Sequence, residues 1–244
     1  AGLSTFISGM LNFLILSILV FSKENNSKYK TRTGWKYDPA LFKRLIRYGL
    51  PNGIQFFLDI AAFSLFILLI GRLGATELAA ASIAFNVSML AFMPMIGLGI
   101  TVSILVGQSL GANEPGQAKI ATSSALQISF TYMTILAMLY LLIPNLFIYP
   151  FSAKADPIEF ESIKSTALVS LRFIALWSIF DSLAIIFSSA LKGAGDTAFI
   201  MLTICLTGLM VLIAPTFLII EIFHLGLNVA WISGVAYVLC LGIV

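Results

Sequence analysis

Residues 46–71 read IRYGLPNGIQFFLDIAAFSLFILLIG. After Arg47 the stretch carries a single charged side chain, Asp59, near its middle. A helix that crosses a bilayer needs about 20 mostly apolar residues. The stretch is therefore long enough to span a membrane, and it holds an acid at the depth where a charge is most costly.

The composition extends this reading to the whole chain. Of the 244 residues 59% are hydrophobic and 10% are charged, and the mean hydropathy is +1.02. A soluble domain has about 45–50% apolar and about 25% charged residues. The sequence therefore predicts a membrane protein with no room for a soluble catalytic domain, and we expect no enzyme activity and no cofactor.

Seven apolar stretches are predicted to be helices, because none alternates over about ten residues as a barrel strand does. They cover about 1–22, 46–71, 78–110, 119–150, 163–191, 196–221 and 225–244. The fold class is thus all-α and polytopic. The third and fourth stretches exceed the bilayer thickness, and Pro94, followed by Gly97 and Gly99, is the predicted bend.

The one long polar run, residues 23–47, holds eight Lys and Arg against two acids. By the positive-inside rule it is cytoplasmic in a plasma (inner) membrane. If successive loops alternate between the two sides of the membrane, starting with residues 23–47 on the inside, the inner loops hold ten of the 14 Lys and Arg residues and the outer loops hold three. The charge thus indicates topology and not a nucleic-acid partner. Residues 39–48 are predicted to form a solvated hinge that also touches anionic lipid headgroups, and the alternative is an amphipathic lead-in to the second span.

Other local features have plain interpretations. Cys205 and Cys240 lie in apolar stretches, which favours small buried side chains over a disulfide or a metal cluster. The glycine-rich turns 107–112 and 191–196 lack the phosphate-loop pattern and are predicted to cap helices. Because the chain starts in apolar sequence without Met and stops in an apolar run, we expect a piece of a longer protein.

Three charged residues remain inside the predicted spans: Asp59, Asp181 and Arg172. An acid at a helix centre costs about 2.5–3.5 kcal/mol on insertion scales, so it usually serves a function and faces a cavity. Because the two spans run in opposite directions and each acid lies near the centre of its span, the acids are expected at similar depth in the membrane. This predicts one shared site. The alternative is that each acid only bonds to a neighbouring helix. Arg172, near the end of its span, is expected to snorkel to the interface.

The neighbours of the acids suggest what the site binds. Asn52, Gln55 and Asp59 share one helix face, and Trp177 precedes Asp181 by one turn. Two carboxylates with nearby amide oxygens suit a hard cation such as Na⁺, or can share protons. We therefore predict a coupling-ion site of Asp59, Asp181, Trp177 and Gln55, in which the two carboxylates are the possible Na⁺ ligands.

A cavity for hydrophobic cations is predicted beside this site. Aromatic and methionine side chains make adaptable surfaces for such ligands. The candidate lining residues are Asn52, Phe56, Phe63, Asn86 and Met89. Lipid contact and helix packing are the alternative reading for each of them.

Several short motifs carry a family resemblance. They read GRLG at 71–74, ELAAA at 77–81, GLGI at 97–100, VGQSLGA at 106–112 and ALKGAGDT at 190–197. Their order and spacing resemble those of the multidrug and toxic compound extrusion (MATE) transporters, with the NorM-type branch as the nearest pattern.

The resemblance implies a domain plan. MATE transporters have twelve helices in two six-helix lobes. On that plan residues 1–22 are the last helix of the N-terminal lobe, residues 23–47 the cytoplasmic linker, and residues 48–244 the C-terminal lobe with its final helix truncated. NorM-type members bind a cation with acids on the seventh and tenth helices and an aromatic residue one turn before the second acid. Asp59, Asp181 and Trp177 fall there, where the family more often has Glu, Asp and Tyr.

The resemblance also implies an activity. We expect an antiporter that exports cationic or amphipathic compounds in exchange for Na⁺ or H⁺. The alternatives are a lipid-linked oligosaccharide flippase of the same superfamily, or a membrane scaffold that transports nothing. Because an alternating cavity needs both lobes, we expect this chain to transport only together with the N-terminal lobe of the same protein.

Overall fold

The computed structural model describes residues 2–32, 34, 37–154 and 157–243, and this part of the chain is built from helices and short turns. The predicted all-α class is confirmed. The predicted linker residue Lys36 and the two chain ends, Ala1 and Val244, lie outside the described residues. The chain forms two compact units, residues 1–47 and 48–244.

The first unit contains α1 (Gly2–Val20) and the short helix α2 (Lys23–Tyr29). α1 is long and apolar enough to cross a membrane. After it the chain turns back, and the Arg32 guanidinium donates to the Phe21 carbonyl oxygen at 2.7 Å. A cation at this point satisfies carbonyl groups left open where a helix ends. The polar run is thus partly helical and is held to the end of α1.

α3 (Pro39–Gly71) joins the basic segment and the second apolar stretch in one helix of 33 residues. The Asp38 carboxylate accepts from the backbone N–H groups of Ala40 and Leu41 and caps its start. Pro51 lies within the helix. The predicted hinge over 39–48 is therefore wrong: the cap starts a helix there, and the apolar residues that follow extend it without a break.

α4 (Ala75–Gly111) stays helical through Pro94, and α5 (Pro115–Leu142) follows after a short turn. α5 ends earlier than predicted, because Pro144 disfavours helical backbone at the residue before it. A short helix, α6 (Pro144–Ile148), and the 3₁₀ turn η1 (Tyr149–Lys154) complete the segment. The single span predicted over 119–150 is thus divided.

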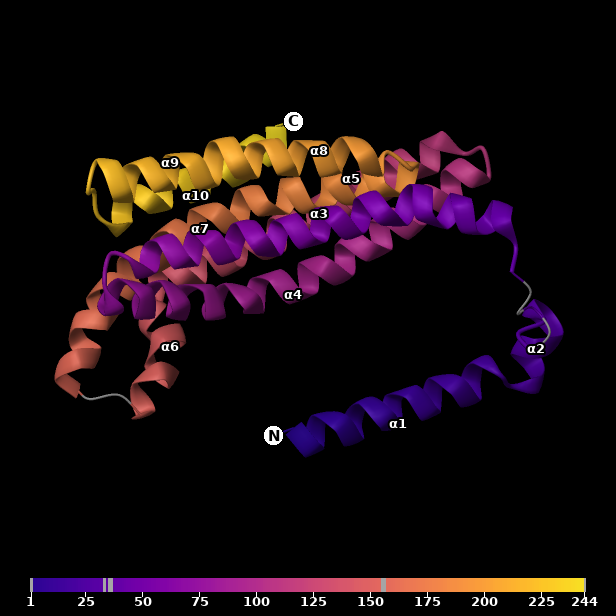
Figure 1. Ribbon diagram of the computed structural model, residues 1–244, viewed down its shortest axis with the longest axis horizontal. Helices are drawn as coiled ribbons and strands as arrows, with labels where there is room; N and C mark the ends of the chain where they lie inside the picture. Colours follow the sequence, from indigo (N-terminus) through magenta and orange to yellow (C-terminus); the bar gives the residue numbers. More distant parts are fainter. Residues whose placement is uncertain (1, 33, 35–36, 155–156, 244) are drawn as a thin grey trace. The chain divides into compact units, whose positions relative to one another are not determined.

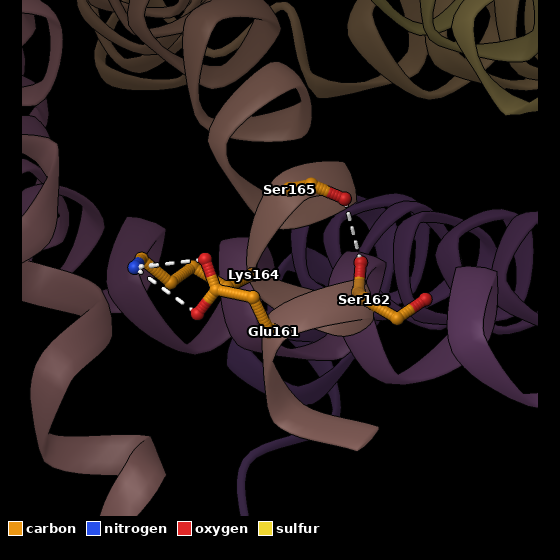
Figure 2. Close-up of polar contacts among 4 residues, drawn as sticks. All are labelled: Glu161, Ser162, Lys164 and Ser165. Carbon is orange, nitrogen blue, oxygen red and sulfur yellow. Dashed lines mark hydrogen bonds and ion pairs between the residues drawn. The ribbon is translucent and has the colours of Figure 1, made fainter. Parts of the chain in front are cut away.

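α7 (Pro157–Ala194) is the longest helix, with 38 residues. Its first turns are polar: the Lys164 Nζ lies 3.4 Å from Glu161, and the Ser165 hydroxyl donates to the Ser162 carbonyl oxygen at 2.8 Å (Figure 2). The candidate membrane span of this helix runs over Phe160–Ala194. The exposed ion pair therefore lies in the first turns of that span.

The remaining chain forms one long helical segment and a shorter helix. The segment comprises α8 (Thr197–Thr207), the π-helical turn η2 (Gly208–Ile213), α9 (Ala214–Phe217) and a second π-helical turn, η3 (Leu218–Ile222). α10 (Leu227–Ile243) is apolar but has only 17 residues. Six helices of the described chain are therefore long enough to span a membrane, and α10 is the shorter counterpart of the seventh predicted span.

α7 lies at the centre of the second unit, where it packs against α4, α5 and α10. Glycines permit the closest approach. A Cβ on Gly107 would lie 3.2 Å from the Gly193 carbonyl oxygen, and one on Gly193 would clash with the backbone of Ser103. Gly107 and Gly193 therefore serve the crossing of α4 with α7 and not a helix cap as predicted. The cap prediction holds for Asp196, whose side chain accepts from the backbone N–H of Phe199.

The turns of the second unit gather at two opposite ends (Figure 1). The α3–α4 and η3–α10 turns share one end, and the α4–α5 and α7–α8 turns share the other. At the first end the Arg72 guanidinium pairs with Glu221 at 2.7 Å. The pair links the α3–α4 turn to the end of η3.

Residues 48–71 of α3 join this unit mainly through side chains. α3 makes fewer close backbone approaches to other helices than α4, α5, α7 and α10 make to one another. Phe66 packs against Phe85 and Trp231, and Phe63 packs against Trp177. These rings belong to an aromatic cluster made of Phe63, Phe66, Phe85, Phe173, Trp177 and Trp231. The cluster fills the space beside the candidate site.

Candidate functional site

Asp59 is held by a hydrogen-bond donor at each carboxylate oxygen. Gln55, one turn earlier on α3, donates from Nε2 to Oδ2 at 3.4 Å. The Tyr237 hydroxyl on α10 donates to Oδ1 at 3.1 Å. Because each oxygen of an ionised carboxyl group has more than one acceptor position, both can still bind a cation. The arrangement therefore orients the carboxylate without occupying it fully.

Asp181 approaches the same site from α7. Its side chain lies within the range of electrostatic interaction with Asp59 and with Tyr237. The structure thus brings together the two acids that the sequence placed at similar depth. Two carboxylates close together in low dielectric repel each other, so a proton or a cation between them is stabilised.

The polar groups at the site include oxygen atoms of the kind that hard cations prefer. Carboxylate oxygens come from Asp59 and Asp181 and a phenol oxygen from Tyr237, while Gln55 presents its amide N–H to Asp59. In the described part of the chain no cluster of three or more His, Cys, Asp or Glu side chains could hold a metal ion.

Lys192, which belongs to the predicted turn 191–196, adds a basic group near Asp59. It lies in the last turn of α7, and its ammonium group is within electrostatic range of Asp59. Its side chain is half-buried. The surroundings of Asp59 therefore include a second acid and one basic group.

Tyr237 is the site residue that sequence reasoning missed. It is buried, and its ring lies beside Gly208 of η2. A tyrosine inside an apolar span must find an acceptor for its hydroxyl, and this was the available signal. The partner, however, is 178 positions away in the sequence, so only the fold identifies it.

Trp177 has a packing role in this structure. Its ring is buried 5.6 Å from that of Phe63 and 6.4 Å from that of Trp231, and Gly234 of α10 lies against it. A Cβ at Gly234 would come within 2.7 Å of the indole. An indole offers no oxygen ligand, and the hydroxyl at the site comes from Tyr237 instead. Any part of Trp177 in ion binding stays a prediction.

Four of the five predicted cavity residues are exposed in this structure, and a cavity lined by all five stays a prediction. Asn52 and Phe56 on α3, and Asn86 and Met89 on α4, are exposed. The Asn86 amide donates to the Ser82 carbonyl oxygen of its own helix at 2.8 Å. Phe63 is partly buried in the aromatic cluster. The four exposed side chains are free to face another part of the complete protein or lipid.

Arg172 lies away from the acids. It is exposed on α7, nine residues before Asp181, which is about 13 Å along a helix. That its long side chain reaches the membrane interface stays a prediction.

Comparisons with known proteins match this arrangement to one family. The MatE family profile matches residues 51–218. The probable multidrug resistance protein NorM of Mesorhizobium japonicum is 30% identical over 198 residues, covering 81% of this chain and 42% of the relative. The multidrug resistance protein PmpM of Pseudomonas aeruginosa is 33% identical over 169 residues, covering 69% of this chain and 34% of the relative.

Solved structures give the same fold at lower identity. One match is a multidrug resistance MATE family transporter of the MOP superfamily in an outward-facing conformation. The match covers 100% of this chain and 53% of the transporter chain, with a TM-score of 0.87 and 17% sequence identity. A MOP superfamily transporter from Pyrococcus furiosus matches with a TM-score of 0.85 and 17% identity over 98% of this chain and 52% of its own. The chain thus spans about half the length of these proteins. Since the family profile covers most of its residues, the chain belongs to the MatE family of multidrug and toxic compound extrusion transporters.

Proposed function

We propose that this chain forms half of a secondary antiporter, which exports cationic or amphipathic compounds in exchange for Na⁺ or H⁺. The observation that carries the proposal is the Asp59–Asp181 pair inside the membrane-spanning part of the second unit. The names of the relatives, multidrug resistance proteins, support drugs as the exported compounds. The family consists of transporters and not of enzymes, as the sequence predicted.

The mechanism follows from competition at the acids. A ligand shifts a conformational equilibrium only through its different affinities for the two states. An ion that neutralises Asp59 and Asp181 removes the negative charge that attracts a cationic drug. Ion binding then weakens drug binding, and by thermodynamic linkage drug binding weakens ion binding by the same factor.

The proposal includes the domain plan. α1 is then the last helix of the N-terminal lobe, residues 23–47 are the cytoplasmic linker, and residues 48–244 are the C-terminal lobe in a plasma (inner) membrane. The division of the chain into units at residues 47 and 48 and the coverage of about half of each solved transporter support this plan. The N-terminal lobe would face the exposed side chains Asn52, Phe56, Asn86 and Met89 and complete the cavity.

The alternatives fit the site less well. A flippase for lipid-linked oligosaccharides needs several basic groups to bind pyrophosphate. This site instead pairs two acids with Lys192, and Arg172 lies about 13 Å from Asp181 along α7. A scaffold that transports nothing has no use for paired acids inside a membrane, which are costly to bury.

The experiment that tests the proposal compares Asp181→Asn with the parent in the complete protein, reconstituted in vesicles. Efflux of ethidium is measured with a Na⁺ gradient and a H⁺ gradient imposed separately. We expect Asp181→Asn to abolish the efflux that either gradient drives. The matched control is Asp196→Asn, because Asn replaces Asp well as a helix cap. Normal gradient-driven efflux by Asp181→Asn would contradict the proposal.

A further inference from the structure

We propose that Tyr237 is a positioning residue of the coupling site, which holds the Asp59 carboxylate in place and connects α3 to α10. This role presupposes the antiport function proposed above. The two donors to Asp59 are not equivalent. Gln55 belongs to α3 and moves with Asp59, whereas Tyr237 belongs to another helix. The Tyr237 bond therefore fixes the carboxylate relative to the rest of the unit.

α10 is itself firmly attached to the core. The Trp231 indole N–H donates to the Ser170 hydroxyl of α7 at 3.1 Å. The hydroxyls of Ser233 and Thr216 of α9 share a buried hydrogen bond of 2.6 Å. Buried side-chain bonds of this kind lie where the dielectric is low and unpaired groups are costly.

Glycines bring α10 closer still to α7. Gly234 lies against the Trp177 ring, and Gly242 lies against Phe180 and Leu183. A Cβ on Gly242 would come within 3.3 Å of the Leu183 Cβ. The phenol of Tyr237 therefore projects from a helix that neighbouring helices hold at several points along its length.

α3, by contrast, is attached through a few side chains. Its aromatic residues pack against the aromatic cluster, and Arg72 pairs with Glu221 at its end. At the depth of the acids, the Tyr237–Asp59 bond is a direct polar connection between α3 and the core. A change in the strength of this bond thus acts on the helix with the weakest backbone packing in the unit.

The ion occupancy of the site determines that strength. A hydrogen bond to an ionised carboxylate is roughly twice as strong as one between neutral groups. A proton or cation bound at Asp59 neutralises the acceptor and weakens the bond from Tyr237. Occupancy at the site is thereby passed on to the position of α3 against α10.

Tyr237→Phe tests this role, because it removes one oxygen atom and keeps the ring. The complete protein is reconstituted in vesicles, and two rates are measured with ethidium. One is efflux driven by Na⁺ and H⁺ gradients imposed together, and the other is exchange of ethidium across the membrane without an ion gradient. We expect driven efflux to fall by about ten- to a hundredfold, as on loss of groups that orient ligands. Exchange is expected to fall less than driven efflux, because it does not depend on the ion gradient.

Tyr140→Phe is the matched control. Tyr140 is also fully buried, and its hydroxyl donates to the Val87 carbonyl oxygen at 3.2 Å, in a different part of the unit. We expect this variant to retain both rates. Retained exchange in Tyr237→Phe shows at the same time that the variant is folded.

Each other result overturns the inference. If Tyr237→Phe keeps driven efflux, its hydroxyl does not position the site. If it loses exchange and driven efflux equally, Tyr237 acts through packing. Asp181→Asn is assayed in the same vesicles to separate this inference from the proposed function. If Asp181→Asn loses driven efflux and Tyr237→Phe retains it, only the role of Tyr237 is overturned. Retention in Asp181→Asn overturns the antiport mechanism itself.

Discussion

At the scale of single residues, the environment of Asp59 decides how the site works. Two neutral donors and a second acid surround its carboxylate. The donors keep the group oriented, and the acid makes an added positive charge favourable. In the function proposed above, a half-buried acid that is oriented but incompletely paired can bind an ion, which a fully paired acid would not do.

The two donors are expected to contribute unequally. Gln55→Ala removes a hydrogen bond of 3.4 Å within α3, whereas Tyr237→Phe removes one of 3.1 Å between helices. We expect Gln55→Ala to lower ion-driven ethidium efflux only about threefold, in keeping with a weak bond of about 0.5–1 kcal/mol. Initial rates of efflux measure this. A larger loss in Gln55→Ala than in Tyr237→Phe would show that the bond within α3 matters more.

The site residues differ in how visible they were in the sequence. Asp59 and Asp181 stand out because a charge in an apolar run is costly, and Gln55 follows from helical spacing. Tyr237 is one of two aromatic residues in the apolar helix α10, and nothing local indicates which group its hydroxyl reaches. Long-range pairing of this kind depends on the packing of α10, which the sequence does not specify by period or charge.

At the scale of elements, glycine contacts set how close the helices lie. α4 and α7 cross where Gly107 meets Gly193, and the backbone of Ser103 fills the place of a side chain. This crossing lies at the same end as the α7–α8 turn and Lys192 (Figure 1). The separation of these helices is thus set at the end of α7 that carries Lys192.

Gly193→Ala is expected to destabilise the unit. The added methyl group would meet the Ser103 backbone, and overpacking of this kind costs about 1–3 kcal/mol. Thermal unfolding of the purified protein in detergent measures the effect as a lower Tm. Gly97→Ala is the control, because a Cβ there meets nothing within 4 Å and the site is helical. Equal Tm values for the two variants would refute the tight crossing.

The sequence predicted the existence of the helices better than their ends. Apolar length identified the spans, but α5 stops at Leu142 because of Pro144, and α3 begins at Pro39 because Asp38 caps it. Two π-helical turns flank the short helix with Pro215. Such ends depend on single residues whose effect competes with the apolar pattern around them.

At the scale of the whole molecule, the chain is a multi-pass membrane protein that covers about half of a MATE transporter. The Arg72–Glu221 pair confirms that two of its turns share one end, and most Lys and Arg residues lie in segments predicted at the other side. The orientation in the membrane is therefore a prediction that accessibility can test.

Cysteine labelling tests this orientation. In the complete protein without other cysteines, Ser27→Cys and Ser152→Cys are treated with a maleimide that does not cross membranes. In intact cells we expect labelling of Ser152→Cys, which belongs to η1, and none of Ser27→Cys in the basic linker until the cells are permeabilised. The reverse pattern would invert the topology.

The central claim is that Asp59 and Asp181 form the site where the coupling ion and the drug compete. The most direct test is the equilibrium affinity of the complete purified protein for ethidium, measured by titration with and without Na⁺ and at several pH values. Because coupling between ligands typically changes affinity about 5–150-fold, we expect added Na⁺ or H⁺ to weaken ethidium binding of the parent within this range. In the double variant Asp59→Asn and Asp181→Asn this response should vanish. A double variant whose ethidium affinity still responds to the ions as the parent does would contradict the claim.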